Sequence, residues 1–214
     1  MRSAFDEQLE LLHKELITMG AVCENVIAMS AEALTAGKPE LAERVLELSA
    51  KIDRKEREIE SMCLKLLLQQ QPVAGDLRVV SSALKMVTDM ARIGDQSADI
   101  AEIITLANIR STDDTYVIYD MSVATIKMVT ESIDAFVKKD MRMAKDVIDY
   151  DDVVDSYFNQ AKEMLIEMLG KPGADGEYAV DLLMIAKYFE RIGDHAVNIA
   201  KWVLFSITGN KEGQ

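Results

Sequence analysis

The sequence predicts an all-α protein built from two tandem, pseudo-symmetric three-helix bundles. Three observations lead to this fold class. Apolar residues recur at helical spacing in six segments, aromatic residues make up only 6% of a 214-residue chain with 3 prolines, and the tetrapeptide RIGD occurs at residues 92–95 and again at 191–194. Low aromatic and proline content favours helices over a β-sandwich or barrel. A repeated motif indicates a duplicated unit.

The first half of the chain contains three segments in which apolar residues recur every three or four positions, the period of a helix with one apolar face. These stripes run over residues 5–26, 41–66 and 86–104. Pro39, which is tolerated in a first helical turn, is expected to open the second helix. The stretch QQQPVAGD at residues 69–76 interrupts the pattern, and Asp76 is expected to cap the third helix.

The second half repeats this arrangement, with stripes over residues 118–135, 147–168 and 189–203. The third and sixth stripes align at an offset of 99 residues (92 and 191), whereas the second and fifth align better at 102 (41 and 143). The difference falls in a loop, as is typical of a duplicated unit. Residues 108–114 separate the halves, so we predict one bundle at residues 1–110 and another at residues 111–214.

The charge of the chain argues against nucleic acid as a partner. Lys and Arg total 24 against 37 Asp and Glu, a formal net charge of −13, and no basic stripe or arm is present. The opening MRSAFDEQLELLHKE has no apolar leader region, and no run of about 18 apolar residues occurs. With only two cysteines, Cys23 as a core residue and Cys63, we expect a cytoplasmic protein without disulfides or membrane insertion.

Acidic residues one helical turn apart occur on the two helices that would be neighbours in each bundle. Like charges at this spacing destabilise an isolated helix, and carboxylates that meet at a seam repel one another unless a cation neutralises them. The second copy contributes Asp151, Asp155, Glu190 and Asp194. The first copy contributes Asp53, Glu56, Asp95 and Asp99. A solvated acidic face, with Gly94 and Gly193 serving only close helix packing, is the alternative interpretation.

The chain resembles the PhoU family, the accessory and regulatory proteins of the phosphate-specific ABC transporter in bacteria and archaea. The resemblance covers essentially the whole length and is carried by QPVAGDLRVVSSALKMVTDMARIGDQSADIAE at 71–102 and IAKYFERIGDHAVNIAKW at 185–202. It implies the PhoU-like six-helix fold and metal ions bound on each bundle by E(D)xxxD pairs from its second and third helices. Candidate ions are divalent or trivalent: Fe, Zn, Mn or Mg.

The resemblance favours a metal site on the second bundle, where all four family positions are acidic. The aligned pairs of the first bundle read Ser49 with Asp53 and Ala91 with Asp95, so each lacks its leading acid. Possible substitutes one turn away are Glu56, Glu60 and Asp99. We therefore expect a weaker site on the first bundle.

The resemblance also implies a negative regulator of phosphate uptake and of phosphate-starvation two-component signalling. Its implied partners are the ATPase subunit of the transporter and a membrane sensor histidine kinase. The long apolar stripes and 13 methionines favour a homodimer. The alternative is a metal-free helical adaptor for another transporter, which would differ in metal content.

A carboxylate-bridged metal enzyme is the least favoured interpretation. The segment Glu10–His13 is an ExxH motif, but a di-iron bundle needs two such motifs, and the chain has only 2 histidines. His13 is expected to be an ordinary surface residue. His195 follows Asp194 and is a minor candidate ligand.

Overall fold

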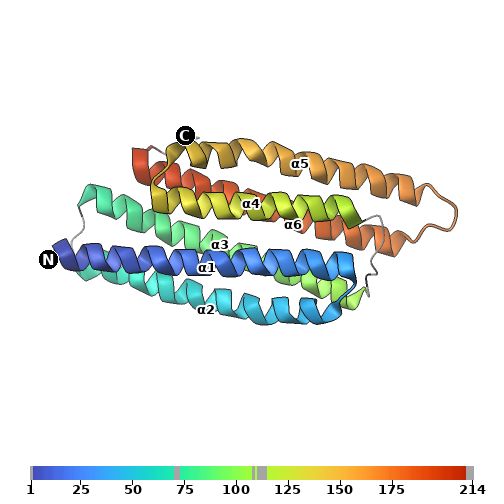
Figure 1. The fold of residues 1–214 in the computed structure, drawn as a ribbon, viewed down its shortest axis with the longest axis horizontal. Coiled ribbons are helices and arrows are strands. Elements are labelled where there is room, and N and C mark those ends of the chain that lie inside the picture. Colours follow the sequence, from blue (N-terminus) through green and yellow to red (C-terminus); the bar gives the residue numbers. More distant parts are fainter. Residues whose placement is uncertain (1, 70–72, 108, 110–114, 211–214) are drawn as a thin grey trace.

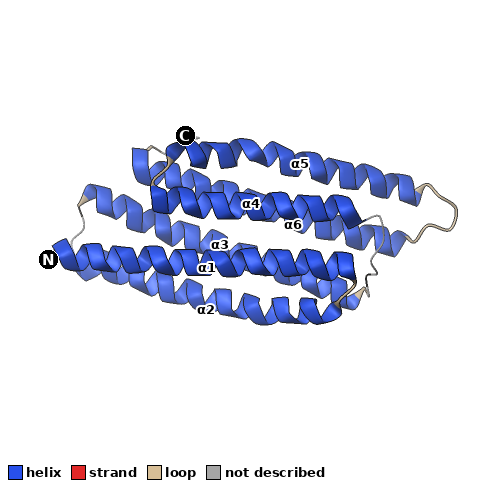
Figure 2. Ribbon diagram, viewed as in Figure 1, coloured by secondary structure: helices blue, strands red, loops and turns tan. Residues whose placement is uncertain are grey.

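The computed structural model describes residues 2–69, 73–107, 109 and 115–210, and its described part consists of six long helices with no strand (Figures 1 and 2). The helices are α1 (Arg2–Ala36), α2 (Pro39–Gln69), α3 (Ala74–Leu106), α4 (Tyr116–Lys138), α5 (Met141–Leu169) and α6 (Gly176–Thr208). The predicted fold class is confirmed. The predicted boundary between residues 110 and 111 lies outside the described residues.

The helices form two bundles that lie side by side along one long axis, α1–α3 in one and α4–α6 in the other (Figure 1). Between the bundles, α3 packs along α6 and α1 packs along α4. The contact of α3 with α6 is as extensive as any contact within a bundle. Buried apolar residues from all six helices therefore form one continuous core.

The helix boundaries have identifiable local causes. Asp140 caps α5 by accepting from the backbone N–H of Arg142 at 2.9 Å. Asp175 caps α6 by accepting from the backbone N–H of Glu177 at 3.1 Å. Each carboxylate satisfies N–H groups that a helix start otherwise leaves unpaired. Gly209 ends α6 with a left-handed φ of 75°.

The predicted cap of α3 is wrong. The N-cap residue is Val73, which makes no side-chain cap, and Asp76 lies in the first turn of the helix. The carboxylate of Asp76 is still well placed there, because a negative charge in the first turn interacts favourably with the helix dipole.

Helix α1 is strongly apolar, and many of its apolar side chains are buried. By length and composition, Phe5–Ala36 is long and apolar enough to cross a membrane. The mean hydropathy of its most apolar window is 1.2, and half of that window is buried inside the protein. Leu12, Leu16 and Cys23 on this helix are completely buried. Burial raises the pKa of the Cys23 thiol to about 12, as expected of a structural core cysteine. Its apolar composition thus serves the core shared by the two bundles.

The two RIGD glycines lie where neighbouring helices approach closely. A Cβ built on Gly94 of α3 would lie 3.0 Å from Cδ1 and 3.3 Å from Cβ of Ile52 on α2. In the second bundle, a Cβ on Gly193 would lie 3.4 Å from Cγ1 of Val154, which corresponds to Ile52 at the offset of 102 residues. The repeated glycine therefore faces the same neighbour in both copies, with a tighter contact at Gly94 than at Gly193.

We predict that Gly94→Ala lowers the free energy of unfolding although alanine is the better helix former. Overpacking costs about 1 to 3 kcal/mol, whereas the gain in helix propensity is at most about 1 kcal/mol. The Cβ of Ile52 is fixed to the α2 backbone in a buried position and has little room to yield. Urea denaturation measures the difference.

The matched control is Gly75→Ala near the start of α3, where an added Cβ meets nothing within 4 Å. This substitution is expected to leave stability unchanged or raise it by up to about 1 kcal/mol. Equal stabilisation by both substitutions would contradict the close-contact account of Gly94.

Candidate metal centre

The carboxylate seam of the second bundle lies between α5 and α6. We define the α5–α6 seam as Asp151, Asp155, Glu190 and Asp194. The two helices pack against each other at Gly193, where a Cβ would lie 3.5 Å from Oδ1 of Asp151, an ordinary van der Waals distance. A carboxylate of α5 therefore lies directly against α6 at this position. The residue after that glycine, Asp194, contributes its own charge to the seam.

The electrostatic environment of Asp151 is unfavourable for a negative charge. Burial, followed by the negative charges of Asp155, Asp194 and Glu190, raises the pKa of its carboxyl group to about 6. Both causes disfavour the ionised form. The seam therefore gathers carboxylates that repel one another, and a cation among them would relieve that repulsion.

One member of the seam already has a cationic partner. The ammonium group of Lys187 donates a hydrogen bond to Oε2 of Glu190, whose side chain is 16% exposed. Lys187 also lies 5.4 Å from the centre of the Phe158 ring on α5. Within the described residues, no group of three or more His, Cys, Asp or Glu side chains is arranged to hold a metal ion. Metal binding therefore requires side-chain rotation, including release of Glu190 by Lys187.

In the corresponding seam of the first bundle, an arginine opposes the negative charges of the carboxylates. Burial raises the pKa of Glu56, and the charges of Glu60, Asp53 and Asp95 act in the same direction. Arg92 opposes them and forms an ion pair of 2.9 Å with Asp95. The structure thus brings Asp53, Glu56 and Asp95 near one another, with a guanidinium group beside them.

A residue without charge replaces the central acid of this first seam. Ser49, which is 8% exposed, corresponds to Asp151 at the offset of 102 residues. Ala91 in turn corresponds to Glu190 at the offset of 99. The first seam consequently has fewer carboxylates in the family positions than the second, and each seam has one cation paired with one of its acids.

Asp99, the fourth candidate of the first bundle, faces the contact between the bundles. It accepts a hydrogen bond from the hydroxyl of Tyr188 on α6. Burial and the charges of Glu102 and Asp95 raise the pKa of Asp99, while nearby Arg191 lowers it. The structure therefore separates Asp99 from Asp53 and Glu56 by giving it partners on α6.

His195, the minor candidate ligand, also turns toward the other bundle. Its Nδ1 lies 2.9 Å from Oδ1 of Asp89 on α3, and Asn198 donates to the same oxygen at 3.3 Å. Sequence reasoning missed Asp89. The available signal was the offset of 99, which pairs Asp89 with Tyr188 and Asp99 with Asn198. The bonds Asp89–Asn198 and Asp99–Tyr188 are thus the same contact, formed twice across the pseudo-symmetric pair α3 and α6.

The burial of the other histidine, His13, differs from the prediction. His13 is half-buried rather than on the surface, and it packs edge-to-face on Phe136 of α4 with ring centres 5.5 Å apart. Burial, followed by the charge of Lys139, lowers the pKa of its imidazole. His13 therefore takes part in the contact of α1 with α4.

These features define a class of protein: an all-helical protein of two tandem three-helix bundles with an acidic seam in each. The PhoU domain matches the chain twice, at residues 16–104 and 118–203. The chain therefore belongs to the PhoU family, which confirms the resemblance seen in the sequence.

Individual relatives agree over nearly the full length. The phosphate-specific transport system accessory protein PhoU homolog of Clostridium acetobutylicum is 34% identical, covering 98% of this chain and 97% of the relative. The crystal structure of PhoU from Pseudomonas aeruginosa is 32% identical with a TM-score of 0.90, covering 96% of this chain and all of that one. The phosphate transport system regulatory protein PhoU from Streptococcus pneumoniae, 23% identical, has the same fold with a TM-score of 0.89.

The raised pKa of Asp151 predicts a pH dependence of stability in chelator-treated protein. A carboxyl group whose pKa rises from 3.8 to about 6 on folding is protonated more readily in the folded state. The free energy of unfolding is therefore expected to fall as pH rises from about 4 to about 7. Asp151→Asn removes this contribution. Urea denaturation across this pH range, in the presence of EDTA, measures the difference.

The control is Glu163→Gln, which changes an exposed carboxylate of the same helix that is not among the charges acting on Asp151. This variant is expected to keep the pH profile of the wild type. An unchanged profile in Asp151→Asn would show that the seam is hydrated enough to hold its charges without cost.

Proposed function

We propose that this chain is an accessory protein of a phosphate-specific transport system and regulates that system negatively. Support comes from full-length similarity to relatives named as accessory proteins of such systems. In this proposal the protein restrains phosphate uptake and phosphate-starvation signalling from the cytoplasm. It acts on the transporter ATPase subunit and on a sensor histidine kinase, as a homodimer. A chain with a net charge of −13 and no basic stripe is suited to act through proteins rather than through DNA.

The second part of the proposal is that regulation depends on a metal ion at the α5–α6 seam. The supporting observation is the half-buried Asp151, on which the negative charges of Asp155, Asp194 and Glu190 all act. The donor set consists of carboxylate oxygens, which suits Mg or Mn and is accepted by Fe and Zn. A bound ion would neutralise these charges and tie α5 to α6. The seam of the first bundle is proposed as a weaker site, because Ser49 and Ala91 stand where the second bundle has Asp151 and Glu190.

The role of this chain's residues in the proposal is structural rather than catalytic. The four seam carboxylates would hold the ion, with Asp151 lying against α6 at Gly193, and Lys187 would compete with the ion for Glu190. Without an ion, Glu190 is paired with Lys187 and the charges of the other acids act on Asp151. The seam would thus have two charge states, from which the contact between α5 and α6 could be regulated.

We predict that elemental analysis of untagged protein, purified without chelator, finds a transition metal or Mg in the wild type. The variant Asp155→Ala/Asp194→Ala is expected to lose it. Loss of outer-shell partners alone weakens metal binding about 10- to 100-fold, so loss of two direct ligands weakens it by more than about 100-fold. Wild type that stays metal-free after incubation with Mg, Mn, Fe and Zn would refute the site.

The control for this measurement is Asp146→Ala/Glu163→Ala, which removes the same charge from exposed positions of α5 that are not among the charges acting on Asp151. It is expected to keep the metal content of the wild type. Equal loss in both variants would show that metal follows net charge rather than the seam.

A metal-free adaptor for another transporter is the second candidate function. The ion pairs Lys187–Glu190 and Arg92–Asp95 favour it, because they already neutralise one carboxylate in each seam. This candidate predicts partner binding that is unaffected by chelators, whereas the metal-dependent proposal predicts binding that chelators change. Absence of turnover of phosphate esters in either metal state would separate both candidates from an enzyme.

A further inference from the structure

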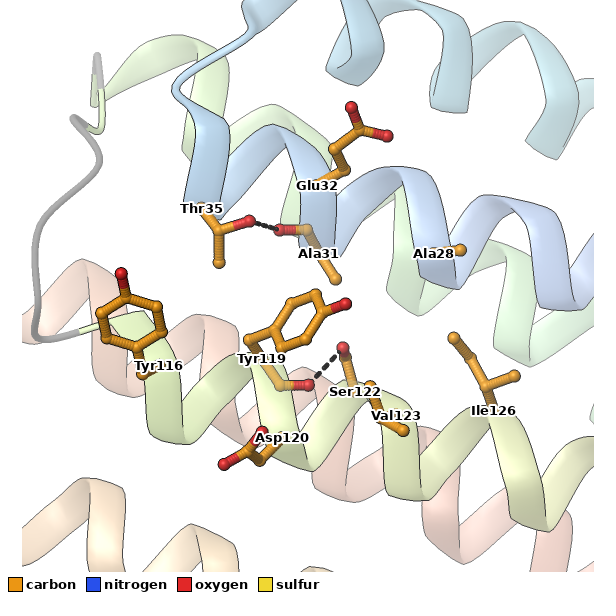
Figure 3. Close-up of a pocket in the computed structure, with 10 residues that line it drawn as sticks. All are labelled: Ala28, Ala31, Glu32, Thr35, Tyr116, Tyr119, Asp120, Ser122, Val123 and Ile126. Atoms are coloured by element: carbon orange, nitrogen blue, oxygen red, sulfur yellow. Dashed lines mark hydrogen bonds between the residues drawn. The ribbon is translucent and has the colours of Figure 1, made fainter.

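An apolar groove lies between the C-terminal part of α1 and the N-terminal part of α4. It has a volume of about 610 Å³. Figure 3 shows side chains of both helices pointing into the space between them. Its lining residues are Ala28, Ala31, Glu32, Thr35, Tyr116, Tyr119, Asp120, Ser122, Val123 and Ile126. The groove belongs to helices other than those of the α5–α6 seam, so its role does not depend on the proposed metal.

The groove exposes apolar surface that the described residues of the chain do not cover. Val123 is 49% exposed and the rings of Tyr119 and Tyr116 are 43% and 63% exposed, while Ala28 on the opposite helix is also exposed. Amphipathic aromatic side chains of this kind are common at protein interfaces. Because these side chains lie together along one groove, they indicate an interaction surface, which a single exposed leucine would not.

Two hydroxyl groups in the lining, those of Thr35 and Ser122, already donate hydrogen bonds within their own helices. Thr35 donates to the carbonyl oxygen of Ala31 at 2.9 Å, and Ser122 donates to the carbonyl oxygen of Tyr119 at 2.6 Å. Both bonds are drawn in Figure 3. Because these donors are used within their own helices, the groove presents mainly apolar atoms to an occupant.

Both rims of the groove are acidic. Glu32 extends from α1 and Asp120 from α4, on opposite sides of the space between the helices (Figure 3). Lys38 pairs with Glu32 at 2.9 Å, but both side chains are more than half exposed. An exposed pair of this kind is worth only about 0 to 1 kcal/mol and exchanges easily. An apolar floor between two acidic rims selects an occupant with an apolar stripe and basic flanks.

We propose that this groove docks an amphipathic helix of a partner protein that carries Lys or Arg on both sides of its apolar stripe. Residues 28–35 of α1 span roughly 10 Å, enough for anchors at positions i, i+4 and i+7 of a docked helix. A second copy of this chain does not fit as well. It carries the same charge of −13 and would bring acidic surface against acidic rims.

The first test uses a labelled 18-residue synthetic helix with leucines at i, i+4, i+7 and i+11 and lysines on both flanks. Fluorescence anisotropy measures its binding to the full chain. The variant Ala28→Arg/Val123→Arg is expected to weaken binding at least tenfold. The control Ile17→Arg/Leu64→Arg adds the same charge at exposed apolar positions outside the groove and is expected to bind like the wild type.

The second test changes only charge at exposed rim positions, so the variants are expected to fold like the wild type. Glu32→Gln/Asp120→Asn is expected to weaken binding of the lysine-flanked helix, whereas Asp152→Asn/Glu163→Gln is not. A version of the helix with glutamates on its flanks is expected not to bind the wild type.

Three results would overturn the proposal. One is equal binding to the groove variant and its control, which would mean attraction by net charge alone. Another is equal binding of the helix with glutamate flanks. The third is a dimer, seen by sedimentation without the probe, that Ala28→Arg/Val123→Arg dissociates and Ile17→Arg/Leu64→Arg does not. That result would assign the groove to a second copy of the chain.

Discussion

The packing of α5 against α6 at Gly193 is the contact on which the candidate site depends. Val154 and Asp151 lie against this position of α6, and the carboxylate of Asp151 is half-buried among other acids. The same glycine in the first bundle, Gly94, receives Ile52. Duplication thus kept the packing contact in both copies but kept the full set of family acids in only one.

The contact between the bundles uses the same duplicated pattern for a different purpose. Asp89 and Asp99 on α3 are bound by Asn198 and Tyr188 on α6, and His195 adds to the first of these bonds. These bonds lie beside a continuous apolar core to which all six helices contribute. Helix α6, which carries half of the α5–α6 seam, is therefore also the helix that packs against α3.

The sequence predicted the helices and their apolar faces well, because the spacing of apolar residues by three or four positions does not depend on how the helices pack against one another. It also placed Asp151, Asp155, Glu190 and Asp194 on adjacent helices. It did not predict the partners of His195 and Asp99, since the direction of a side chain at the α3–α6 contact depends on how the bundles are rotated against each other. The prediction of Asp76 as the N-cap was wrong because acidic residues are common both at the N-cap and in the first turn of a helix. The sequence pattern therefore does not distinguish the two positions.

The central claim is that the α5–α6 seam holds a metal ion. The most direct measurement is a crystal structure from crystals grown with Mn²⁺, with anomalous scattering recorded to locate the ion. The account predicts an anomalous peak among the carboxylates of Asp151, Asp155, Glu190 and Asp194, with Glu190 released from Lys187. A map without a peak at the seam, with the Lys187–Glu190 ion pair intact, would contradict it.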